Sequence, residues 1–149
     1  MVSPGGKLRI LFLCIGNSCR SQMAEGWTRH LKNALIEPYS AGIEPTDMDP
    51  YAVRVMREAG VDISSHRPRL VDDLANIAFD YVVSVCDHAY ERYSSFPART
   101  RLVHAGFDDP LRLARTAATE EEALDHYRRV RDAIRAFVGT LPEALSAET

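Results

Sequence analysis

Short apolar runs alternate along the chain with segments of helical periodicity. The run from Ile10 to Leu13 is continuous and apolar, and the run from Phe79 to Cys86 is β-branched and nearly all apolar. Such runs are typical of parallel strands that are buried on both faces. The pattern therefore predicts a strand over 7–13 and another over 79–86, with shorter strands over 38–42 and 100–104.

Helices are predicted between these strands. The first is expected to begin near Ser21, with an apolar face that recurs every four residues: Met23, Trp27, Leu31 and Leu35. The second is expected from Pro50 to Gly60, with Thr46 or Asp49 as its N-cap. Its inward residues are expected to be Val53, Met56 and Ala59.

A capping box opens the last and longest predicted helix. Thr119 is followed three residues later by Glu122, and acidic residues fill the first turn. Its apolar face is expected to consist of Leu124, Tyr127, Val130, Ile134, Phe137, Val138 and Leu141. A short helix is also predicted over 71–76, and a loop or irregular helix over 87–93.

This order of elements predicts an α/β fold. We expect one domain over 1–149, with a four-stranded parallel sheet and helices on both faces, and a frayed leader over 1–6. Of the residues, 46% are hydrophobic and 26% are charged, as in soluble globular proteins. The net charge of −3 gives no general attraction to nucleic acid, and no apolar stretch is long enough for a membrane span. We therefore expect a cytoplasmic monomer.

The loop between the first strand and the first helix carries the candidate chemistry, in the order Cys14-Ile15-Gly16-Asn17-Ser18-Cys19-Arg20. Backbone N–H groups converge at a helix N-terminus, and together with Arg20 they favour a thiolate at Cys14 and can hold a tetrahedral oxyanion. Gly16 permits a tight turn. The Asn17 side chain can brace the loop, and the Ser21 hydroxyl can donate a hydrogen bond to the thiolate.

Two further candidates follow later strands. Cys86 ends its strand as Cys14 ends the first, so both thiols can reach one edge of a parallel sheet; a buried structural thiol is the alternative for Cys86. Asp109 lies just past the last strand and is the best candidate for a general acid, with Asp108 as its rival. His66 is expected to be a solvated loop histidine. An odd number of cysteines, three, argues against a secreted disulfide framework.

The segment from Leu11 to Gly26 resembles the low-molecular-weight tyrosine phosphatase superfamily, and more closely its thioredoxin-coupled arsenate reductase branch. The segment from His104 to Pro110 is similar to the His-Trp-Gly-Phe-x-Asp-Pro segment of those reductases, and the resemblance runs over almost the whole chain. It implies a redox role for Cys86, the role of general acid for Asp109, and a structural role for Cys19.

The resemblance is incomplete at two places. The reductases usually carry a third cysteine several residues after the second, where this chain has Tyr93. Some members also hold a potassium ion with Asn, Glu, Ser and Asp side chains. Asn17, Glu25 and Ser40 match that pattern, but Arg69 stands in place of the Asp. We expect the Arg69 cation to replace the ion, and no metal to be bound.

The resemblance implies an arsenate reductase that serves arsenic detoxification. In this hypothesis Cys14 attacks arsenate held by the loop and Arg20, and Asp109 protonates the departing oxygen. Cys86 then attacks Cys14, arsenite leaves, and a disulfide remains. No tightly bound cofactor is expected; thioredoxin, glutaredoxin or a small thiol would reduce the disulfide.

Two other functions remain open at this point. The first is a phosphatase that cleaves phosphomonoesters through a phosphocysteine, with Cys86 as a bystander. The second is an oxyanion-binding or thiol-sensing module that turns nothing over. The second function would not need a usable acid, so the presence of Asp109 argues against it.

Overall fold

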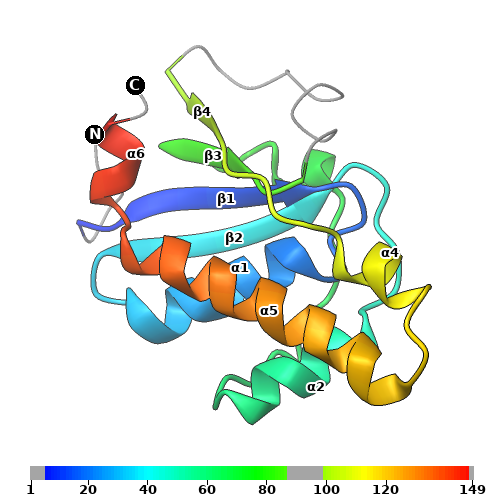
Figure 1. The fold of residues 1–149 in the computed structure, drawn as a ribbon. Helices are drawn as coiled ribbons and strands as arrows, with labels where there is room; N and C mark the ends of the chain where they lie inside the picture. The colour runs from blue at the N-terminus through cyan, green and yellow to red at the C-terminus, as the bar shows by residue number, and fades with distance from the viewer. Residues whose placement is uncertain (1–5, 87–98, 148–149) are drawn as a thin grey trace.

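The computed structural model describes residues 6–86 and 99–147 (Figure 1). The strands are β1 (Leu8–Cys14), β2 (Ile36–Gly42), β3 (Tyr81–Ser84) and β4 (Arg101–His104). The helices are α1 (Arg20–Leu31), α2 (Pro50–Glu58), the 3-10 helix η1 (Val71–Leu74), α4 (Pro110–Ala114), α5 (Glu120–Gly139) and α6 (Glu143–Ala147). The segment 87–93, predicted to be a loop or irregular helix, lies outside the described residues, as does the predicted leader except for its last residue.

The four strands form one parallel sheet in the order β2-β1-β3-β4, which confirms the predicted sheet. The register pairs Cys14 with Gly42, Leu13 with Ser84, and Ser84 with His104. The carboxyl ends of all four strands therefore lie at the same edge of the sheet. In open α/β sheets this edge is where ligands bind.

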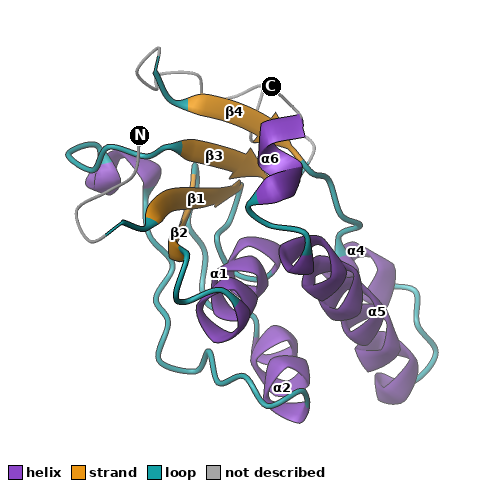
Figure 2. Cartoon of the chain, turned by 90° about the vertical axis from the view of Figure 1, so that its left-hand side faces the viewer, coloured by secondary structure: helices purple, strands orange, loops and turns teal. Residues whose placement is uncertain are grey.

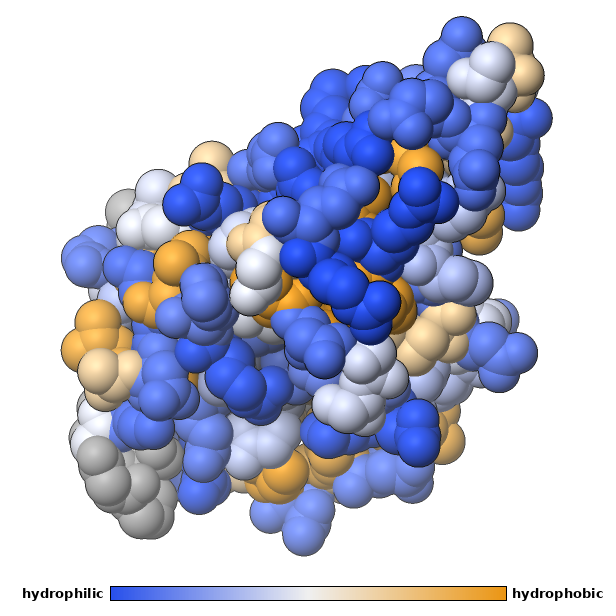
Figure 3. Space-filling model, turned by 90° about the horizontal axis from the view of Figure 1, so that it is seen from below, coloured by the Kyte–Doolittle hydropathy of each residue, from blue (hydrophilic) through white to orange (hydrophobic). Residues whose placement is uncertain are grey.

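Helices α1 and α5 lie together on one side of the sheet, while η1 lies on the other side (Figure 2). Helix α1 packs on β1, β2 and α5, and α2 packs against α5 (Figure 1). The face of the molecule on the side of α2 is mainly hydrophilic, with hydrophobic residues in small separate groups (Figure 3). No helix in the described part of the chain is both long and apolar enough to cross a membrane.

The apolar faces of α1 and α2 differ in part from the predicted ones. Met23 and Trp27 are buried, but Leu31 and Leu35 are 39% and 50% exposed. Helix α1 ends at Leu31, and a turn then leads into β2, where Ile36 is fully buried. The four-residue spacing of apolar residues therefore continues in the sequence beyond Leu31, where the helix ends.

In α2 the buried residues are Ala52, Val55 and Met56, whereas Val53 and Ala59 are half-buried. Buried positions at i, i+3 and i+4 give one continuous stripe along a helix. Val53 is one position out of register with this stripe, and Ala59 lies just past the end of the helix as its C-cap.

The ends of the helices follow the predicted signals. Asp49, rather than Thr46, is the N-cap of α2: its side chain accepts a hydrogen bond from the Tyr51 N–H at 2.9 Å. Gly60 ends α2 with a φ of +87°, a conformation that favours glycine. At the start of α5, the Thr119 hydroxyl accepts a hydrogen bond from the N–H of Glu122 at 3.1 Å.

Candidate active site

Residues 14–20, here called the Cys14 loop, connect β1 to α1. The carbonyl oxygens of this loop accept hydrogen bonds from the backbone of segment 44–49. The N–H groups of Glu44, Thr46 and Asp49 donate to the carbonyl oxygens of Ile15, Gly16 and Ser18 at 2.9, 2.9 and 3.1 Å. A trans peptide directs its N–H opposite to its C=O. Because these carbonyls face segment 44–49, the N–H groups of the same peptides are directed to the other side, which is the arrangement that an anion cradle requires.

Asn17 lies at the centre of the Cys14 loop and is fully buried. Its side-chain Nδ2 donates to the Ser21 hydroxyl at 2.8 Å, and its Oδ1 accepts from the backbone N–H of Arg69 at 2.7 Å. These contacts are the kind that the predicted bracing role requires. A side chain at Gly42 would come within 2.6 Å of the Ile15 carbonyl oxygen, so the loop also depends on a glycine in β2.

Cys14 and Cys86 are both buried, and their thiol groups lie within hydrogen-bonding reach of each other. This contact and burial raise the pKa of the Cys14 thiol well above its usual value, while Arg20 and the Ile15 N–H act in the opposite direction. The expectation of an acidic Cys14 in the reduced protein is therefore wrong. The loop alone favours a thiolate at Cys14, but the thiol of Cys86, two residues after β3, and the burial of Cys14 outweigh this effect on its pKa.

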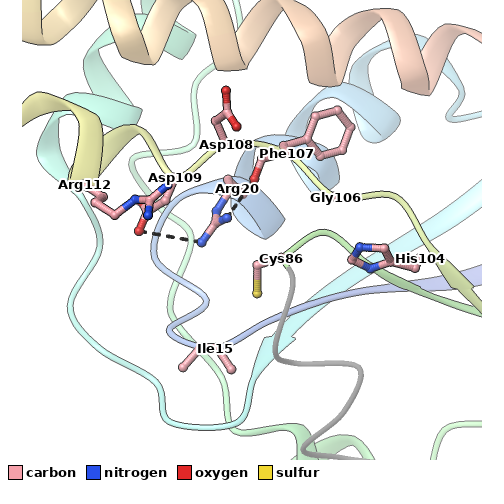
Figure 4. Close-up of a pocket in the computed structure, with 9 residues that line it drawn as sticks. All are labelled: Ile15, Arg20, Cys86, His104, Gly106, Phe107, Asp108, Asp109 and Arg112. Atoms are coloured by element: carbon pink, nitrogen blue, oxygen red, sulfur yellow. Dashed lines mark hydrogen bonds and ion pairs between the residues drawn. The ribbon is translucent and has the colours of Figure 1, made fainter.

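Arg20 joins the Cys14 loop to the segment after β4 (Figure 4). Its Nη1 donates to the Phe107 carbonyl oxygen at 2.9 Å, and its Nη2 lies 3.9 Å from Asp109 Oδ2. Asp109 is the N-cap of α4, accepting from the Leu111 N–H at 3.1 Å, whereas Asp108 points away from Arg20 (Figure 4). The geometry thus favours Asp109 over Asp108 as the acid.

These groups border a cleft of about 670 Å³. Its lining consists of Ile15, Arg20, Cys86, His104, Gly106, Phe107, Asp108, Asp109 and Arg112. The volume of the cleft is larger than that of a single tetrahedral oxyanion. Sequence analysis assigned no site role to His104 or Arg112. The available signals were the position of His104 at the end of β4 and that of Arg112 in the first turn after Asp109.

Cys19 in the Cys14 loop and Ser21 in the first turn of α1 are both buried. Cys19 is 7% exposed and belongs to the core, and burial raises the pKa of its thiol well above the usual value. This environment suits the structural role expected for Cys19. Ser21 is fully buried and accepts the hydrogen bond from Asn17, and its predicted bond to the Cys14 sulfur stays a prediction.

The buried carboxylate of Glu25 is bound by two partners. It accepts from the Ser40 hydroxyl at 2.7 Å and from Arg29 Nη1 at 2.6 Å. Arg69 is exposed and meets the Cys14 loop through its backbone N–H, and the replacement of an ion by its cation stays a prediction. Arg29, one helical turn after Glu25, is the cation that pairs with this carboxylate. The described residues contain no cluster of three or more His, Cys, Asp or Glu side chains that could hold a metal.

His66 is half-buried rather than solvated, which corrects a second expectation. Its Nδ1 lies 2.9 Å from the side-chain oxygen of Gln22, a residue in the first turn of α1. Burial lowers the pKa of His66. Sequence alone gave no signal for this contact, because the two residues lie 44 positions apart.

Comparisons with known proteins agree with this geometry. A family model described as low molecular weight phosphotyrosine protein phosphatase matches residues 9–149. A protein of Bacillus subtilis strain 168 named arsenate reductase is 46% identical over 126 residues, which cover 84% of this chain and 88% of the relative. A solved arsenate reductase in the phosphate binding state is 27% identical, with a TM-score of 0.73 and coverage of 95% of this chain and 99% of the other. An arsenate reductase in its oxidized state is 26% identical, with a TM-score of 0.74 and coverage of 89% and 95%.

Proposed function

Because the chain belongs to the low molecular weight phosphotyrosine protein phosphatase family, we propose that it is an arsenate reductase acting through Cys14 and Cys86. The observation that carries the proposal is the contact between these two buried thiols at the ends of neighbouring strands. A phosphatase needs one thiol beside its acid and its arginine. A reductase needs a second thiol that can reach the first.

Arsenate enters the cleft and is held by the N–H groups of the Cys14 loop and by the guanidinium of Arg20. In this step Arg20 exchanges part of its contact with Phe107 for the oxyanion. The Cys14 sulfur attacks arsenic, and Asp109 protonates the oxygen that departs. Overall, the thiol and hydrogen arsenate yield the Cys14–arsenic adduct and one water molecule, with the thiol proton ending in that water.

Cys86 completes the reaction. Its thiolate attacks the Cys14 sulfur, a sulfur–sulfur bond forms, and the electron pair of the sulfur–arsenic bond stays on arsenic. Arsenic is thereby reduced from As(V) to As(III) and leaves as arsenite, while the two thiols are oxidised to a disulfide. The short path between the two sulfur atoms supports this step.

A thiol reductant then restores both cysteines by disulfide exchange and supplies two electrons for each turnover. Thioredoxin, glutaredoxin with glutathione, and a small thiol alone are the three candidate classes. The cleft leaves room beside the oxyanion for a group of the reductant to approach Cys86. Tyr93, at the place of the usual third cysteine, favours direct attack by the reductant on the Cys14–Cys86 disulfide.

The decisive experiment measures arsenite formation by the purified, reduced protein with each reductant system, beside release of p-nitrophenol from p-nitrophenyl phosphate. Arsenite formation together with a Cys14–Cys86 disulfide, located by mass spectrometry, is the expected result. Cys86→Ser should abolish steady arsenite formation and keep oxyanion binding, whereas Cys19→Ala should keep both. Rapid phosphate ester hydrolysis without arsenite under any reductant would instead make the protein a phosphatase.

A further inference from the structure

Helix α2 packs against the first half of α5 (Figure 1). Tyr127 of α5 is fully buried, and its ring meets the ring of Tyr51 edge to face, with 5.5 Å between the ring centroids. Its hydroxyl donates a hydrogen bond to Asp49 Oδ2 at 2.6 Å. Burial and the contact with Asp49 raise the pKa of Tyr127 far above its usual value, so the phenol keeps its proton and remains the donor.

Asp49 connects Tyr127 to the Cys14 loop. Its Oδ1 accepts the capping hydrogen bond from the Tyr51 N–H, and its Oδ2 binds the Tyr127 hydroxyl. The backbone N–H of the same residue donates to the Ser18 carbonyl oxygen at 3.1 Å. One residue is therefore held through its side chain by α5 and binds the loop through its backbone.

The Ser18 carbonyl belongs to the same peptide unit as the N–H of Cys19. Because the two groups of a trans peptide point in opposite directions, a Ser18 carbonyl that faces Asp49 directs the Cys19 N–H to the side where the oxyanion would lie. Residues 44–47 of the supporting segment are exposed, whereas Asp49 at its end is half-buried and reaches α5. The direction of the Cys19 N–H thus depends on how firmly Asp49 is held.

We infer that Tyr127 is a positioning residue for oxyanion binding, which holds Asp49 and through it the peptide between Ser18 and Cys19. Neither Tyr127 nor Asp49 lines the cleft in the described part of the chain, so Tyr127 acts through the loop rather than on the oxyanion. The inference deepens the proposed function and rests on it, because it concerns the loop that would hold arsenate.

Two substitutions break this link at different points. Tyr127→Phe removes only the hydroxyl, and Asp49→Ser keeps a good N-cap side chain for α2 that is too short to reach Tyr127. The control is Tyr39→Phe, which removes a 2.8 Å hydrogen bond between a tyrosine and the Glu37 carboxylate within β2.

The same three measurements are made on the wild type, the single variants and the double variant of Asp49 and Tyr127. Calorimetry gives the dissociation constant of inorganic phosphate, steady-state kinetics gives kcat and KM for arsenate, and circular dichroism gives the melting temperature. Phosphate affinity and KM report the geometry of the loop, whereas the melting temperature reports the stability of the fold.

We expect Tyr127→Phe and Asp49→Ser each to weaken phosphate binding about threefold to tenfold and to raise KM for arsenate by a similar factor, with kcat changed less than about twofold. The double variant should bind phosphate within about twofold of the weaker single variant, because both substitutions break the same link. Tyr39→Phe should stay within about twofold of the wild type.

Unchanged phosphate affinity of Tyr127→Phe would overturn the inference, even with a lowered melting temperature, since the hydroxyl would then only stabilise the fold. Losses of affinity that add up fully in the double variant would also overturn it, as would an equal loss in Tyr39→Phe.

The phosphate measurement keeps the inference apart from the proposed function. If the wild type binds phosphate and the variants behave as expected, but no arsenite forms under any reductant, the reductase proposal fails and the role of Tyr127 stands. If the wild type binds neither phosphate nor arsenate, both are overturned.

Discussion

The guanidinium of Arg20 donates a hydrogen bond to the carbonyl oxygen of Phe107 at 2.9 Å, across 87 positions of the chain. The same side chain is 15% exposed and has its other nitrogen 3.9 Å from Asp109. One cation therefore links the loop that would hold the oxyanion to the segment that would supply the acid.

Arg20→Lys is expected to lower kcat/KM for arsenate by about 100-fold or more, as loss of a transition-state donor does. A lysine keeps the charge but cannot bind Phe107 and two oxyanion oxygens with one planar group. Steady-state kinetics with a matched melting curve test this expectation. A lysine variant with the activity of the wild type would show that charge alone is sufficient at this position.

Asp109→Asn is expected to reduce kcat by about 100-fold, within the usual range for loss of a general acid. Asparagine is as good an N-cap as aspartate, so α4 and the fold should be retained. Asp108→Asn should lose far less activity, because that side chain points away from Arg20 (Figure 4). The comparison of the two kcat values, with circular dichroism as a check on folding, decides between the neighbouring acids.

Replacing Cys86 by alanine is expected to lower the pKa of Cys14. The contact with Cys86 is the largest cause that raises this pKa, so its removal should shift thiolate formation at Cys14 to lower pH. The rate of alkylation of Cys14 by iodoacetamide, followed by mass spectrometry as a function of pH, reports the midpoint. A midpoint that moves to higher pH, or does not move, would contradict the assigned cause.

Arg29→Met is expected to destabilise the protein by about 1–2 kcal/mol, less than the loss of a fully buried ion pair because the Arg29 side chain is half exposed. The loss leaves the buried carboxylate of Glu25 with the Ser40 hydroxyl as its remaining hydrogen-bond partner in the described structure. Arg54→Met, which breaks an exposed pair with Glu120, should change stability by less than about 0.5 kcal/mol. Urea unfolding of both variants tests the difference.

Most of the fold was predictable because the two central strands are mainly apolar and because α2 and α5 begin at clear N-cap signals. The runs around Ile10 and Val83 lie in these two central strands, where buried residues follow one another without alternation. The exposure of Leu31 and Leu35 was not predictable from spacing, since the helix ends before the apolar pattern does. Helices α4 and α6 were also missed, because five residues are too few to show a period.

The site was predictable where its residues are neighbours in the sequence, as in the Cys14 loop. The prediction failed where the chemistry depends on distant contacts. The pKa of Cys14 is raised mainly by the thiol of Cys86, which follows β3, and the environment of His66 includes Gln22 of α1. Such contacts exist only once the sheet has formed, so they cannot be predicted from a local sequence pattern.

The position of β1 at the centre of the sheet has a consequence for synthesis on the ribosome. The Cys14 loop leaves the ribosome early, but its thiol partner, its arginine clamp and its acid come from Cys86, Phe107 and Asp109. A nascent chain that stops before β3 therefore contains Cys14 and none of these three groups. During that interval the cysteine depends on the reducing environment of its compartment, and only a nearly complete chain can shield it.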